Sequence, residues 1–284
     1  MATRLGILGF PNTGKSFSRS FIKKGEECFV ISPSGKEHFL KHSEGKPIEK
    51  LNISLGPFDS TEKVMANLKL ESIHQVIRAF NQTGFPVGVP LKITGNYVIC
   101  DDVNYVFDYL KFISKHMLHI KNVFQADFTH FVSKIITGQV FRSRKSGGEA
   151  FAKYLDLASD CLNNIFIGAE QLRDDLIIAT EFHTTMKDGD NYDNFLGVFV
   201  PAGRMINDKL LPKSYFDYTL FTHCLSWSEN IEEKDRYKFV VVKKEPYDGR
   251  MGNMFPEHEK GMIPNNLEVV LNRMREKVST LKSA

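Results

Sequence analysis

The sequence predicts an α/β fold built on a mostly parallel central sheet flanked by helices. An apolar run at residues 5–8, a glycine-containing loop and a helical segment precede a second apolar run at 28–32, which gives a strand–helix–strand unit. Two further apolar runs, at 97–100 and 176–183, end in polar residues. Strands that alternate with helices in this way form a parallel sheet.

Length and composition fit one large domain. The chain has 284 residues, of which 42% are hydrophobic and 25% are charged. We expect a single domain over residues 1–284, with a core at 1–200 and an antiparallel extension and final helix at 201–284. A net charge of +3 is too small to indicate a nucleic-acid partner unless a basic surface is concentrated locally.

The cysteines and the first residues bear on the compartment. The four cysteines are widely scattered and form neither a C-x-x-C metal pair nor a disulfide framework, which indicates a reducing environment. The first apolar run begins within a few residues of Met1, and no apolar run reaches the length of a membrane span. We therefore expect a cytoplasmic protein with no membrane partner.

The loop after the first apolar run carries the most specific motif. Residues 9–16 read GFPNTGKS and match G-x-x-x-x-G-K-[ST], which chance produces in about one chain in a hundred of this length. Glycines let backbone N–H groups turn toward phosphates, Lys15 adds a cation, and Ser16 offers a hydroxyl to Mg²⁺. A helix from near Lys15 to residue 23 would add its positive dipole end. The expected nucleotide-binding residues are Gly9, Phe10, Pro11, Asn12, Thr13, Gly14, Lys15, Ser16 and Phe17.

Helical periodicity predicts the helices that cover the sheet. Apolar residues recur at helical spacing over 60–82, 103–119 and 122–137, and a further helix is expected over 149–163. We expect their phenylalanines to pack in the core rather than to stack on bases. The basic loop at 141–148 fits either a phosphate-backbone contact or a solvated surface loop.

Two acids follow the apolar run at 97–100. Asp101 and Asp102 give this segment the shape of a Walker B strand, in which the first acid reaches Mg²⁺ and the second orients the attacking water. The alternative is structural, because an Asp at the end of a strand commonly caps the following helix.

The apolar run at 176–183 also ends in polar groups. We expect it to lie beside the Walker B strand, where His183 is the candidate sensor of the γ-phosphate and Glu181 is a second candidate. A capped strand end is the alternative. The loop at 184–194 is net acidic, which argues against simple binding of a phosphate backbone.

The last third of the chain changes character. Short apolar runs between Pro, Gly and Asn turns predict antiparallel strands, and a final helix is expected to run to about residue 282. Arg250 lies in a loop at 248–254. The expected strands are 195–200, 210–211, 215–224 and 237–242.

Taken in order, these segments resemble the phage-encoded RecA-like P-loop ATPases, the group that includes the Sak-type single-strand annealing ATPases. The resemblance runs from about residue 4 to 277 and rests on GFPNTGKS, FVISPSGKEHFL, YVICDDVNYVF, LIIATEFH, AGRMINDKLLPKSYFDYTLFT and a tail reading YKF and later GNMFPEHEKGMIPNNLEVVLNRM. It implies a RecA-like core that hydrolyses ATP with Mg²⁺, assembles into rings or filaments, and acts on single-stranded DNA in phage recombination or annealing. It further implies the host cytoplasm and a single-strand-binding protein as a partner.

The resemblance also implies roles for individual residues. Lys15 and the loop around it would bind the phosphates, Asp101 would hold Mg²⁺ with Ser16, Asp102 would orient water, and His183 would sense the γ-phosphate. Arg250 falls where relatives tend to have a lysine before Gly-Met-Phe, and would reach the nucleotide of a neighbouring subunit. This sequence departs there and reads Arg-Met-Gly-Asn-Met-Phe.

A second function remains open from the residues alone. The near-neutral charge and the acidic loop at 184–194 also fit a nucleotide-dependent assembly or scaffold protein with little hydrolysis or DNA binding. A GTPase is disfavoured because no Asn-Lys-x-Asp segment is present, and a nucleotide kinase because no arginine-rich lid extends beyond Arg142 and Arg144.

Overall fold

The structure is a computed structural model, and several predicted segments lie outside the residues it describes. These segments are the basic loop at 141–148, most of the helix expected over 149–163, most of the acidic loop at 184–194 and the strand expected at 210–211. The described residues are 1–34, 39–135, 152–153, 155–156, 159–160, 163, 167–185, 197–199, 215–225, 230–244, 247–255 and 261–283.

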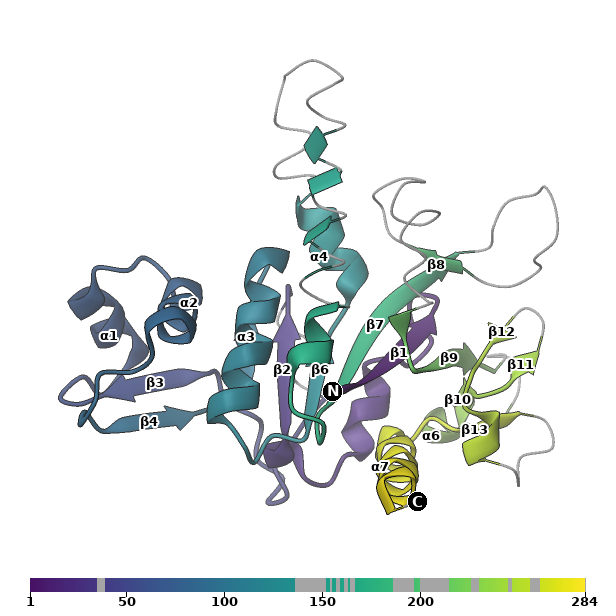
Figure 1. The fold of residues 1–284 in the computed structure, drawn as a ribbon. Coiled ribbons are helices and arrows are strands. Elements are labelled where there is room, and N and C mark those ends of the chain that lie inside the picture. Colours follow the sequence, from purple (N-terminus) through teal and green to yellow (C-terminus); the bar gives the residue numbers. More distant parts are fainter. Residues whose placement is uncertain are drawn as a thin grey trace.

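One large sheet organises these residues (Figure 1). Eight strands lie in the order β13-β10-β9-β1-β7-β6-β2-β5, and β8 pairs with the far end of β7. Their bounds are β1 Thr3–Gly9, β2 Cys28–Ser32, β5 Tyr97–Ile99, β6 Asn122–Gln125, β7 Ile177–Thr185, β8 Gly197–Phe199, β9 Tyr218–Cys224, β10 Tyr237–Val240 and β13 Met262–Pro264.

Most strands of this sheet are parallel, which confirms the predicted α/β class. The neighbours from β9 through β1, β7, β6 and β2 to β5 all run in the same direction. Among the described strands, the antiparallel pairs of this sheet are β8 with β7, β10 with β9 and β13 with β10. The last third was expected to be an antiparallel extension, but its strand β9 pairs in parallel with β1, in the middle of the sheet. The antiparallel edge therefore begins only at β10.

Helices cover both faces of the sheet, because alternate residues of a strand point to opposite faces. On β1, Leu8 packs in a cluster with α2, α3 and α4, whereas Leu5 and Ile7 belong to a cluster with α7. The helices are α1 Thr61–Leu68, α2 Ile73–Thr83, α3 Val103–His116, α4 Phe128–Ile135, α6 Glu233–Arg236 and α7 Leu267–Ser283, with short 3-10 helices η1 Phe17–Phe21, η2 Gly25–Glu27, η5 Gly168–Gln171 and η8 Gly252–Met254.

A small lobe is attached beside the edge strand β5. Figure 1 shows α1 and α2 with strands β3 (Asn52–Leu55) and β4 (Leu91–Thr94) projecting from one side of the molecule. β3 and β4 form their own antiparallel pair, and β11 (Lys243–Lys244) pairs separately with β12 (Tyr247–Asp248). Among the described helices, none is long and apolar enough to cross a membrane.

Two predicted helices differ in the structure. The helix expected over 60–82 is two helices, because Lys69 adopts the left-handed conformation that ends α1 and Ser72 caps α2. The helix expected over 122–137 is a buried strand, β6, followed by α4. A buried run of four residues has too few positions for periodicity to separate a strand from a helix.

Candidate functional site

The loop at 9–16 follows β1 directly at the C-terminal end of that strand. Two of its residues have positive φ, 61° at Asn12 and 92° at Gly14. The side chain of Lys15 is buried, and its Nζ donates to the backbone oxygens of Gly9 and Phe10, at 2.8 Å each. The ammonium group is therefore held against the mouth of the loop, where it can bind phosphate oxygens in place of these carbonyls.

Two residues of the C-terminal strands fix the shape of this loop. The Thr13 and Thr222 hydroxyls hydrogen-bond at 2.5 Å. The Tyr237 ring lies against Gly14, where an added Cβ would be 2.8 Å from the ring carbon Cγ. Gly14 is thus required both by its positive φ and by the lack of space above it.

The prediction of an α-helix after the loop is wrong. The segment forms only the five-residue 3-10 helix η1. The hydroxyl of Ser18 donates to the Lys15 oxygen at 2.6 Å, and that of Ser20 donates to the Phe17 oxygen at 2.7 Å. Serine side chains that bond to nearby carbonyls compete with the hydrogen bonds of an α-helix. The electrostatic contribution of a full helix is therefore missing from this loop.

Glu181 is the acid that the structure places beside the loop. It lies on β7, next to β1 in the sheet, and is only 1% exposed. Ser16 Oγ donates to Glu181 Oε2 at 3.3 Å, and Arg19 of η1 forms an ion pair with Oε1 at 2.6 Å. The sequence offered Glu181 only as a second candidate for sensing the γ-phosphate. In the structure it is Glu181, rather than Asp101, that contacts the hydroxyl expected to bind Mg²⁺.

His183 lies beside the first residue of the loop. In the register of the two parallel strands it pairs with Gly9. Its backbone N–H donates to Thr129 Oγ1 at 3.0 Å, and its Nε2 is 3.6 Å from Asp127 Oδ2. Asp127 is 4% exposed, has a φ of 63° and is also 3.4 Å from His130. His183 therefore lies next to the loop, but its strand pairs with β1 and β6 and not with β5, so the expectation that it lies beside the Walker B strand is wrong.

Asp101 and Asp102 lie far from the loop, so the expectation that they neighbour Lys15 and Ser16 across adjacent strand ends is wrong. They follow β5, the edge strand, and three strands (β2, β6 and β7) separate β5 from β1. At about 4.8 Å between strands, this places β5 roughly 19 Å from β1. Asp102 is instead the N-cap of α3, accepting from the Asn104 N–H at 2.9 Å, which is the structural alternative for this residue.

Arg250 is exposed and lies beside β9. Its N–H donates to the oxygen of Thr219 at 2.8 Å, and Thr219 pairs with Gly6 of β1, three residues before the loop begins. The backbone of Arg250 is therefore hydrogen-bonded to β9, next to β1 in the sheet. Its action on a neighbouring subunit stays a prediction.

Sequence reasoning missed Asp127 and Arg19. Asp127 follows the apolar run of β6 in the way that Asp101 follows the run of β5, but the helical spacing over 122–137 predicts a helix at this place. No motif marks Arg19, whose partner is 162 residues away in the sequence. A search for acids after every short apolar run would have found Asp127 as well as Asp101.

The residues around Ser16 fit a magnesium ion. A hydroxyl and a carboxylate are hard oxygen ligands, and Mg²⁺ in nucleotide sites binds through one or two carboxylates plus the substrate phosphates. Within the described ranges, no group of three or more His, Cys, Asp or Glu side chains is arranged to hold a metal ion. Comparison of the chain with protein-family models and with curated proteins gives no match.

Proposed function

We propose that this chain binds ATP at the loop 9–16 and, with Mg²⁺, hydrolyses the bond between the β- and γ-phosphates. One observation carries the proposal. Lys15, Ser16, Glu181 and His183 lie together at the C-terminal end of β1, where the neighbouring strand β7 pairs with it. Ligands of open α/β sheets bind at this edge, outside the carboxyl ends of the strands.

Each side chain has a role in this reaction. The N–H groups of the loop and the Lys15 ammonium bind the β- and γ-phosphates. Ser16 and Glu181 would hold Mg²⁺, which supplies charge neutralisation when it is bound. His183 pairs with Gly9 and is held by Asp127, so it is placed to contact the γ-phosphate or the attacking water.

The test separates Glu181 from the acid pair of the edge strand. We expect Lys15→Ala to abolish tight ATP binding, and Glu181→Gln to reduce phosphate release by about 100-fold, a loss typical of a catalytic electrostatic group. Asp101→Asn is the matched control and should leave turnover within about twofold, because β5 is three strands removed. Equal loss in Asp101→Asn and Glu181→Gln would overturn the assignment.

The wider role that the resemblance implies is a RecA-like ATPase that acts on single-stranded DNA as a ring or filament in recombination. Sedimentation with and without ATP tests assembly, and titration of a fluorescent single-stranded oligonucleotide at low salt tests DNA binding. A protein that hydrolyses ATP but binds no DNA would retain the nucleotide site and lose the recombination role.

A second candidate is a nucleotide-dependent scaffold with slow hydrolysis. The ion pair between Glu181 and Arg19 favours it, because a carboxylate already bound to a guanidinium is a weaker ligand for a metal. ATP-dependent assembly with negligible phosphate release would support this function over the first. An increase of phosphate release in Arg19→Met would support it further.

A further inference from the structure

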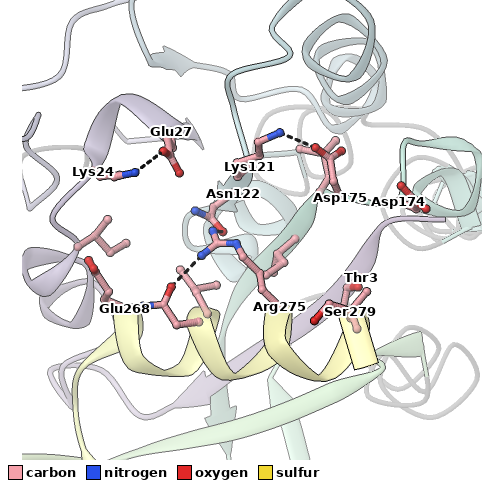
Figure 2. Close-up of a pocket in the computed structure, with 16 residues that line it drawn as sticks. Thr3, Lys24, Glu27, Lys121, Asn122, Asp174, Asp175, Glu268, Arg275 and Ser279 are labelled. Carbon is pink, nitrogen blue, oxygen red and sulfur yellow. Dashed lines mark hydrogen bonds and ion pairs between the residues drawn. The ribbon is translucent and has the colours of Figure 1, made fainter. Parts of the chain in front are cut away.

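A cavity of about 640 Å³ lies at the N-terminal ends of β1, β6 and β7, whereas the loop follows the C-terminal end of β1. Figure 2 shows its lining residues, which include Thr3, Asn122 and the helix residue Arg275. Thr3 begins β1 and Gly9 ends it. Six residue steps at about 3.3 Å each separate the cavity from the phosphate loop by roughly 20 Å. The cavity is therefore a site of its own.

Most of the cations in this cavity are neutralised by neighbours. Lys24 pairs with Glu27 at 3.0 Å, and Lys121 pairs with Asp175 at 2.6 Å. Arg275 differs, since within the described residues no carboxylate pairs with it. The cavity thus contains one guanidinium whose charge no neighbouring acid balances directly.

Neutral groups hold this guanidinium in place. Its NH2 donates to Asn122 Oδ1 at 2.7 Å and its NH1 donates to Asn272 Oδ1 at 3.0 Å. Asn122 is 3% exposed and donates in turn to the Cys28 thiol, whose pKa burial raises to about 12, so the thiol carries no charge at neutral pH. These bonds orient the guanidinium without cancelling its charge, and further N–H donors of its fork are left for a ligand.

The remaining lining selects among anions. The charged residues that line the cavity sum to −1, so the lining as a whole repels a multiply charged anion more strongly than a singly charged one. Apolar side chains complete the wall, among them Ile22, Leu271 and Val278. The charged residues are Lys24, Lys121, Arg275, Glu27, Asp174, Asp175 and Glu268.

We propose that this cavity binds a small organic monocarboxylate with an apolar body. The carboxylate binds the guanidinium of Arg275, whose planar fork matches a carboxylate in geometry. The apolar body lies against Leu271 and Val278, which are on the same helix as Arg275.

Calorimetric titration of the full chain with three probes of equal chain length tests this site. Hexanoate should bind with a Kd of about 1 mM or tighter, whereas the neutral hexanamide and the more highly charged hexyl phosphate should each bind at least about 10-fold more weakly. Arg275→Gln should weaken hexanoate binding by about 10-fold or more, as expected for the loss of a charge-assisted hydrogen bond. Arg273→Gln, an exposed arginine of the same helix that does not line the cavity, should change nothing.

Val278→Phe provides a second variant that keeps Arg275 but fills the cavity. It should also weaken hexanoate binding. Thermal unfolding shows whether Arg275→Gln folds, and if it does not, Val278→Phe alone tests whether hexanoate binds in the cavity. The proposal is overturned if hexanoate does not bind with a Kd below about 10 mM, if hexanamide binds equally well, or if both cavity variants bind like the wild type. Tighter binding of hexyl phosphate would overturn the carboxylate assignment.

Discussion

Arg19 and Glu181 form an ion pair inside the protein, with 2.6 Å between Arg19 NH1 and Glu181 Oε1 and at most 1% of either side chain exposed. A buried charge whose partner is removed is costly. We expect Arg19→Met to lower the free energy of unfolding by about 3–5 kcal/mol. The double variant Arg19→Met with Glu181→Gln should recover part of this loss, because it leaves no uncompensated charge. Urea denaturation of the wild type, of Arg19→Met and of the double variant measures these differences in the free energy of unfolding.

The control for this prediction is an exposed ion pair. Lys46 and Glu44 pair at 2.8 Å with side chains 75% and 70% exposed. Water and salt screen such a pair, so Lys46→Met should leave the denaturation midpoint unchanged. Equal losses in Arg19→Met and Lys46→Met would show that burial does not decide the strength of the first pair.

Gly14 and Gly88 provide a matched test of the crowding above the loop at 9–16. Both have positive φ, 92° and 79°, but an added Cβ at Gly88 meets no atom within 4 Å, whereas at Gly14 it meets Tyr237 at 2.8 Å. Each change to Ala should cost about 1–2 kcal/mol for the left-handed backbone. Only Gly14→Ala should cost more than this and also weaken ATP binding, as measured by denaturation and by titration of a fluorescent ATP analogue.

Asp102 should matter for stability rather than for turnover. Its side chain caps α3, and Asp102→Ala should lower the free energy of unfolding by about 1 kcal/mol. Asp101→Ala is the matched control and should leave stability unchanged, because Asp102 and not Asp101 caps the helix. Loss of ATP hydrolysis in Asp102→Ala at unchanged stability would restore the Walker B interpretation.

The stability of the chain should fall as the pH is lowered through about 6.5, the ordinary pKa of histidine. Burial lowers the pKa of His74, which hydrogen-bonds to Tyr109 OH at 2.8 Å and stacks on Tyr105, while the charges of Asp101 and Asp102 oppose this shift. The unfolded chain therefore binds more protons in this range, so the free energy of unfolding rises with pH. His74→Gln should flatten this dependence in denaturation curves recorded at several pH values, and an unchanged slope would exclude His74 as its source.

The sequence predicted the parts of the fold that depend on local patterns. The glycine-containing loop after β1 and the parallel class of the sheet follow from a short motif and from the alternation of strands with helices. His183 was expected beside the acid pair, but its strand pairs with β1 and β6. The order of the strands does not follow from such patterns. An apolar strand ending in two acids can lie anywhere in the sheet, and only the pairing of β5 with β2 shows that Asp101 is at the margin.

Long-range contacts account for the rest. The pair of Arg19 with Glu181 and the contact of Thr13 with Thr222 join residues separated by 162 and 209 positions. Such contacts depend on the packing of the complete chain, and neither propensity nor periodicity encodes them. The acid beside Ser16 therefore required the structure, although its residue type and strand were visible in the sequence.

The contacts of Thr222 and Tyr237 with the loop have a consequence for how the protein is made. The loop at 9–16 is synthesised well before the side chains that shape it, because Thr13 and Thr222 are separated by 209 positions in the chain. Because domains fold as units once their contacts are present, the loop reaches its final form only after β9 and β10 join the sheet. Nascent chains that end before these strands should therefore lack the final form of the loop, and under the proposed function they should not retain ATP.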